Sequence, residues 1–359
     1  MTCPDRTAIV QILYPVWASL RCQRLSWSHT GINGIERDAF GTGLTSLEML
    51  DLSHNGIEEL HLQQLLRLTL LCKLYLSSNN LVELHPHQFV GLTNLGILDM
   101  SNNYLVELHP HQFIGLTNLV ALYLSNNNLG ELHPQQFLRL TRLYKLDLSS
   151  NNLVALHPQQ FVGIQHLASL DLSNNSIVEL HPQQFVGVRK MKWLHLSNNN
   201  LVELHPQQFV LLPNLVKLYL SNNNFVELHP QQFAALTRLQ ILYLSYNHIN
   251  VIYSYVSLFF NIFQLLDFSS NNLVFFQLSE NVQYSVLVFL SLSENRLTAL
   301  PRGIFQYTTY LEYLDLSYNY VFSGQSNGLN RYSGYEIKCA TQSNIRVFSN
   351  PSEFHKDIG

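Results

Sequence analysis

The sequence predicts an α/β solenoid, a stack of short coils curved into a horseshoe with a parallel β-sheet on its concave face. The first observation is a constant period, because an Asn recurs every 24 residues over twelve consecutive copies. The second is that apolar residues keep fixed places around each Asn, as Leu122, Leu124 and Leu129 do around Asn127. A lone 24-residue coil could not offset the backbone entropy of about 1–2 kcal/mol per residue, so the coils must stack.

The row of Asn residues, here called the Asn ladder, is interpreted as structural. A buried amide can bond backbone groups of its own coil and of the adjacent coil, groups that a coil cannot pair in any other way. We therefore expect no ligand at these positions. The twelve residues of the ladder are Asn55, Asn79, Asn103, Asn127, Asn151, Asn175, Asn199, Asn223, Asn247, Asn271, Asn295 and Asn319.

The segment before each Asn alternates between polar and apolar residues, as in 145–149, which is the pattern of a strand with one buried face. Twelve such strands would form the sheet, with neighbouring strands about 4.8 Å apart. After each Asn a Pro recurs in seven copies, which favours irregular or short 3₁₀ backbone on the convex face. Because these outer segments are wider than the strand spacing, the stack is expected to bend.

The pattern LxxLxLxxNxLxxLxxxxFxxLxx, which covers residues 20 to 322, resembles the 24-residue form of the leucine-rich repeat family. The resemblance implies a protein-recognition module of the kind found in secreted proteins and ectodomains. Toll-type receptors, slit-like guidance proteins, matrix proteins and the leucine-rich immune proteins of insects are similar, and the His-Pro-x-x-Phe turns resemble the insect group in particular. It also implies three parts, an N-terminal cap at 1–30, the repeat array at 31–322 and a C-terminal cap or tail at 323–359.

Cys3 and Cys22 are similar to a reduced form of the cysteine-bearing caps of extracellular members, which implies a disulfide between them. An alternative interpretation takes Ile9 to Ala18 as the apolar part of a signal peptide cut after Ala18, which would remove Cys3. Cys339 stands alone in the last segment, so the chain is either truncated or capped in another way. Cysteine usage favours an oxidising, extracellular location.

Composition and motifs exclude several classes of function. A net charge of −4 without a basic run argues against a nucleic-acid partner. The apolar stretch Ile249 to Leu266 keeps the repeat phase and carries polar residues, so it is interpreted as two ordinary coils and not as a membrane span. Asp171, His195 and Ser197 are the residue types of a catalytic triad, but nothing near them predicts an oxyanion hole or a walled pocket. We predict no enzyme activity and no cofactor.

Two polar columns accompany the first eight ladder residues, four and six positions after each Asn. Glu and His at such places could hold a metal ion, could make stability depend on pH, or could be a solvated rim. The eight coils are nearly identical, and tandem duplication of a coil repeats any surface residue whether or not it has a function. The solvated rim is therefore the favoured interpretation, and no metal site is predicted. The columns are Glu59, Glu83, Glu107, Glu131, Glu179, Glu203 and Glu227, with Ala155 in the fifth copy, and His61, His85, His109, His133, His157, His181, His205 and His229.

The candidate site is on the outward face of the sheet, six, four, two and one positions before each Asn. Tyr, Ser, Asn and Asp dominate these positions, a composition typical of protein-binding surfaces. Large and charged residues cluster over three adjacent coils, where Trp193 is expected in line with Tyr219 and Tyr243. This aromatic patch consists of Trp193, His195, Lys217, Tyr219, Tyr243 and Tyr246.

These observations predict a secreted or cell-surface protein that binds an unidentified protein partner, with a role in innate immunity. A structural or adhesive matrix protein and an intracellular scaffold are alternatives. A homodimer is also left open.

Overall fold

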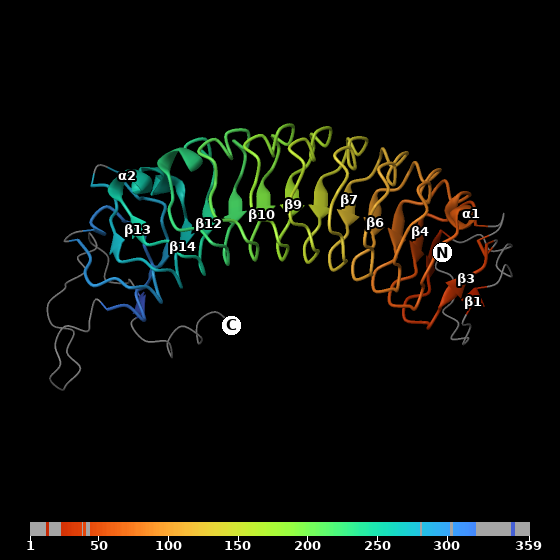
Figure 1. Cartoon of the computed structure of the whole chain (residues 1–359), viewed down its shortest axis with the longest axis horizontal. Coiled ribbons are helices and arrows are strands. Elements are labelled where there is room, and N and C mark those ends of the chain that lie inside the picture. The colour runs from red at the N-terminus through yellow and green to blue at the C-terminus, as the bar shows by residue number, and fades with distance from the viewer. Residues whose placement is uncertain are drawn as a thin grey trace. The chain divides into compact units, whose positions relative to one another are not determined.

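The computed structural model describes residues 12–13, 23–37, 39–40, 44–280, 282–301, 304–320 and 346–348, and is a solenoid of parallel strands with few helices, as predicted (Figure 1). The chain divides into two compact units, unit 1 up to Met191 and unit 2 from Lys192. Cys3, Cys22 and Cys339 lie outside the described residues, and so does most of each predicted cap.

Unit 1 contains a parallel sheet in the order β9-β8-β7-β6-β5-β4-β2, with one strand from each coil. In Figure 1 these strands follow one another along the unit, and α1 lies on the far side of its coil from the sheet. The strands are β2 (Arg24–Ser26), β4 (Met49–Asp51), β5 (Lys73–Tyr75), β6 (Ile97–Asp99), β7 (Ala121–Tyr123), β8 (Lys145–Asp147) and β9 (Ser169–Asp171). Outside this sheet, β1 (Ile12–Leu13) pairs with β3 (Gly34–Ile35), and α1 spans Leu62–Leu65.

Unit 2 continues the same pattern with a parallel sheet in the order β18-β17-β16-β14-β12-β11-β10. Its strands are β10 (Trp193–His195), β11 (Lys217–Tyr219), β12 (Ile241–Tyr243), β14 (Leu265–Asp267), β16 (Phe289–Ser291), β17 (Tyr313–Asp315) and β18 (Arg346–Phe348). A second small sheet pairs β13 (Val251–Ile252) with β15 (Phe275–Phe276). The helical segments are η2 (Pro230–Gln232), α2 (Ser254–Ser257) and η3 (Leu258–Ile262).

The strands are short because only three residues per coil alternate before the chain turns. In β8 the central Leu146 is fully buried while Lys145 and Asp147 are half-buried, and β4, β6, β9, β10, β11, β12 and β14 follow the same pattern. A central Leu in each strand therefore forms the core side of the sheet, and its two neighbours form the outward face.

The Asn ladder joins each coil to its neighbour. The Oδ1 of Asn151 accepts a hydrogen bond from the backbone N–H of Leu129 at 3.1 Å, 22 residues earlier. Its Nδ2 donates to the carbonyls of Leu124 at 2.9 Å and Leu148 at 3.1 Å, in the previous coil and its own coil. One buried side chain thereby satisfies backbone groups of two coils.

The residue before each ladder Asn has a left-handed backbone, with φ between 51° and 56°. Asn or Ser occupies most of these positions, and a short side chain that bonds locally tolerates this conformation. Tyr246 and Tyr318 are exceptions, with φ of 55° and 53°. A bulky residue there is strained, and Tyr246 belongs to the predicted patch.

The loop side of each coil, defined as the segment between a ladder Asn and the next strand, packs through a column of Phe and a column of Gln. The rings of Phe89, Phe113 and Phe137 stack with centroids 6.4 and 6.3 Å apart. The buried Gln112 donates from Nε2 to the carbonyl of His85 at 2.9 Å, in the preceding coil. Turns predominate in these segments. Of the seven Pro-containing copies, the one at η2 forms a 3₁₀ helix and the other six form turns.

The stretch from Ile249 to Leu266 differs from the prediction of two ordinary coils. It contains β13, α2 and η3, and the buried hydroxyl of Tyr284 donates to the carbonyl of Ser257 at 3.1 Å. Aromatic side chains are frequent in this stretch, and the rings of Phe260 and Phe263 pack with centroids 5.6 Å apart. Within the described ranges, no helix has the length and apolar character needed to cross a bilayer.

Candidate protein-binding face

The predicted aromatic patch lies on three neighbouring strands of unit 2. The pairing register places His195 beside Tyr219 and Tyr219 beside Tyr243. Their rings stack, with centroids 4.0 Å and 5.1 Å apart and interplanar angles of 17° and 12°. These three half-buried rings form a continuous aromatic row across the strands.

Trp193 does not belong to this row, so the prediction that it lies in line with Tyr219 and Tyr243 is wrong. The register pairs Trp193 with Lys217, and Lys217 with Ile241. The reason is that coils align residues 24 positions apart, and Trp193 is 26 positions before Tyr219. Trp193 and Lys217 therefore begin a second row beside the aromatic row.

The second row continues over the following strands with large apolar residues that are not part of the predicted patch. Ile241, Leu265, Phe289 and Tyr313 are in register with one another, and each is half-buried on the outward face. The rings of Phe289 and Tyr313 lie with centroids 6.2 Å apart. The signal was present as the same spacing of 24 residues, at the position six before each Asn.

Tyr246 lies in the loop that follows β12, three residues after Tyr243. Its side chain is 61% exposed, and its backbone N–H donates to the carbonyl of Ser269 at 3.0 Å. The neighbouring coil therefore holds the strained backbone in place, while the ring remains open to solvent.

Partial burial changes the electrostatics of the aromatic row. It raises the pKa of Tyr219 above its usual value, and the pKa of Tyr243 is raised by burial and then by the nearby Tyr219 and Asp267. Both phenols are therefore neutral at physiological pH and can donate a hydrogen bond to a partner.

The Asp residues of the sheet face are occupied by local contacts. The Oδ1 of Asp267 accepts hydrogen bonds from the backbone N–H of Ser269 at 2.9 Å and from its hydroxyl at 2.7 Å. In the coils that carry Tyr instead, the hydroxyls of Ser221 and Ser245 bond each other at 2.9 Å. These bonds connect the strand ends to the loops that follow them, which restricts the side chains of the face.

The sheet face of unit 1 has a different character, because Asp and Tyr alternate along it from β4 to β8. Tyr75 lies between Asp51 and Asp99. Its pKa is raised, first by burial and then by the two carboxylates. Lys145 places its Nζ 4.8 Å from the ring centroid of Tyr123, a cation–π contact. This face is polar and partly self-paired, which favours unit 2 as the contact surface.

The residues considered for catalysis and metal binding make other contacts in the structure. The carboxylate of Asp171 accepts hydrogen bonds from the backbone N–H and the hydroxyl of Ser173, and the ring of His195 stacks on Tyr219. Throughout the described part of the chain, no three His, Cys, Asp or Glu side chains gather closely enough to hold a metal ion. Cys72 is exposed and carries a reduced thiol, and the disulfide predicted between Cys3 and Cys22 lies outside the described residues.

Comparison with known proteins places this geometry in context. A sequence model described as "Leucine rich repeat" matches seven overlapping segments, 22–81, 69–129, 117–177, 141–201, 165–225, 189–249 and 213–273. A search of curated protein sequences finds no match.

Among solved structures, the LRIM1/APL1C complex matches with a TM-score of 0.72 and 25% identity, over 87% of this chain and 55% of that chain. The TLR13–ssRNA13 complex matches with a TM-score of 0.70 and 26% identity, over 83% of this chain and 47% of that chain. The leucine-rich repeat domain of APL1B matches with a TM-score of 0.67 and 23% identity, over 91% of this chain and 94% of that domain. The chain thus spans about half of the TLR13 chain and nearly all of the APL1B domain.

Proposed function

The chain belongs to the leucine-rich repeat family, and we propose that it is a secreted or cell-surface recognition protein that binds a protein partner on the sheet face of unit 2. The observation that carries the proposal is the stacked row His195–Tyr219–Tyr243 beside the apolar row that runs from Ile241 to Tyr313. Large, half-buried and rigid side chains lose little conformational entropy when they are covered, so they are suited to anchor a partner.

The expected partner has an apolar centre with acidic groups at one border. Trp193 and Lys217 lie at the N-terminal end of the apolar row, where the Lys217 ammonium can attract a carboxylate. The phenols of Tyr219 and Tyr243 can donate hydrogen bonds beside it. A polyanion is a poorer fit, because the chain carries a net charge of −4.

The family context supports an extracellular immune role. The similar structures include a complex of LRIM1 and APL1C and the Toll–Spatzle complex, described as a molecular hub in Drosophila development and innate immunity. We propose the same kind of location and role for this chain. A matrix or scaffold protein would use the array mainly as a spacer, and its function would not depend on particular aromatic residues.

The test is quantitative affinity capture from extracellular fluid of the source organism, followed by surface plasmon resonance with each captured protein. Trp193→Ala and Tyr219→Ala should each weaken binding by about 2 kcal/mol or more, the size typical of buried aromatic anchors. Tyr310→Ala is the matched control, because Tyr310 is 59% exposed and lies outside the strands of the sheet.

Circular dichroism should show the same fold for all three variants. Unchanged affinity for both Trp193→Ala and Tyr219→Ala would contradict the assignment of the site. Captured partners that are all nucleic acids would contradict the protein class of the ligand.

A further inference from the structure

The loop side of unit 1 carries two exposed rows with opposite hydrogen-bonding character. The first row contains Glu83, Glu107 and Glu131, and the second contains His85, His109 and His133. Each row advances by one coil at a time, and within a coil the Glu and His are two residues apart. Side chains two residues apart in extended backbone point to the same side, so the rows run next to each other.

The imidazole tautomer follows from the backbone contacts. The Nδ1 of His85 accepts a hydrogen bond from the backbone N–H of His87 at 3.2 Å. His109 and His133 accept equivalent bonds from the residues two positions later, also at 3.2 Å. An Nδ1 that accepts carries no proton, so the proton of the neutral ring is on Nε2. The His row is therefore a row of fixed Nε2–H donors.

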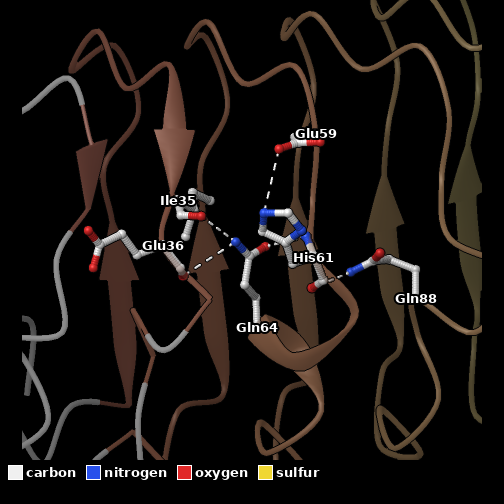
Figure 2. A network of polar contacts seen from close by, with 6 residues as sticks. All are labelled: Ile35, Glu36, Glu59, His61, Gln64 and Gln88. Carbon is white, nitrogen blue, oxygen red and sulfur yellow. Dashed lines mark hydrogen bonds and ion pairs between the residues drawn. The ribbon is translucent and has the colours of Figure 1, made fainter.

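Among the residues that the structure describes, these donors and carboxylates have no ion-pair partner beyond the first coil. Figure 2 shows the exception at the first coil, where Glu59 Oε1 lies 3.5 Å from His61 Nε2. In that coil the backbone N–H of His61 donates to Gln64 Oε1 at 2.9 Å, and α1 follows. Over the described ranges, Glu83, Glu107 and Glu131 make no ion pair with a His of their own coil. Both rows thus face solvent with unused hydrogen-bonding capacity.

An apolar border accompanies the Glu row. Val82 and Val106 precede Glu83 and Glu107 and are 52% and 53% exposed. A partner that covers the two rows would therefore also remove apolar surface from water, which adds to polar pairing.

We propose that this loop side binds a second copy of the chain through the Glu and His rows. A two-fold axis parallel to the rows and midway between them places each Glu opposite the His of the same coil in the other copy, and each His opposite its Glu. The carboxylate then accepts a charge-assisted hydrogen bond from the Nε2–H, and three coils provide six such bonds. A second copy is the occupant because it repeats both chemical groups with the same coil spacing, so every coil pairs in one register.

The test is sedimentation equilibrium of the full chain over a range of micromolar concentrations, with two triple variants. The first variant carries Glu83→Arg, Glu107→Arg and Glu131→Arg, which puts Arg opposite His in a homodimer. The second carries His85→Glu, His109→Glu and His133→Glu, which puts Glu opposite Glu. Each variant alone should dissociate into monomers, with a dimer Kd raised by roughly tenfold or more.

The decisive sample is an equimolar mixture of the two variants. In a mixed dimer every Arg and every remaining His faces a Glu, so the mixture should regain the wild-type dimer content. At a concentration low enough for the wild type to be monomeric, thermal melts of both variants should match the wild type, because all six side chains are exposed. A wild-type chain that is monomeric throughout, or a mixture that stays monomeric, would overturn the proposal. Because the patch in unit 2 is not altered, this result is independent of partner binding on the sheet face.

Discussion

The Asn ladder can be tested with a single substitution, Asn151→Ala, in the middle of unit 1. Asn151 is 6% exposed, and its side chain makes four hydrogen bonds with backbone groups. The variant removes all four bonds and leaves the backbone of two coils otherwise unchanged.

The magnitude follows from which groups lose their last partner. The carbonyl of Leu124 keeps a bond from Asn127 Nδ2 at 3.1 Å, and the carbonyl of Leu148 keeps one from Asn175 Nδ2 at 3.0 Å. The buried N–H of Leu129 has only Asn151 Oδ1 as its acceptor in the described chain. An orphaned buried donor costs about 1–3 kcal/mol, and the weakened carbonyls add to it, so we expect a loss of about 2–3 kcal/mol.

The assay is urea unfolding followed by circular dichroism, with Asn152→Ala as the matched control. Asn152 is the next residue and is exposed, and its backbone N–H still donates to the carbonyl of Leu129 after the substitution. The control should change the free energy of unfolding by less than about 0.5 kcal/mol. Equal losses for the two variants would refute the structural interpretation of the ladder.

Three further outcomes are expected. Gly163→Ala should lower stability more than Gly115→Ala. Both residues have φ near +100°, but only at Gly163 would the new Cβ lie 2.6 Å from a carbonyl oxygen of the previous coil, and such overpacking costs about 1–3 kcal/mol beyond the backbone strain. Equal shifts in melting temperature for the two variants would disprove this. The pKa values of Tyr219 and Tyr243 are raised in the folded state, so the fold favours the neutral phenols. Their contribution to stability is fully present below pH 10 and is lost as pH rises through the folded pKa values. An ultraviolet titration measures phenol ionisation, and the signal lost in Tyr219→Phe and Tyr243→Phe reports these two groups. If the lost signal belongs to phenols that ionise at or below pH 10, the sign is wrong. Tyr246→Asn should raise the free energy of unfolding by about 1 kcal/mol in urea titrations, since Asn tolerates the left-handed backbone, and a destabilised variant would show that the Tyr246 ring packs usefully.

The sequence by itself determined the repeating coil, the strand in each copy and the ladder. These features depend on contacts between residues a fixed distance apart in the chain, so a period of 24 residues encodes them directly. It also located three strands of the candidate face, because large residues gather on three consecutive coils at Trp193, Tyr219 and Tyr243.

Only the tertiary structure decided which side chains of that face form a common surface. The 24-residue spacing already put His195 in one column with Tyr219 and Tyr243, and the structure adds that their rings stack. The pairing register moved Trp193 to the second row and added Ile241 and Leu265. The tertiary structure also determined the tautomer of His85, because the Nδ1 of this ring accepts a hydrogen bond from the backbone N–H of His87. Neighbouring rows differ by only two residues in sequence, so composition cannot separate them, whereas backbone hydrogen bonds between coils align each residue with one specific partner.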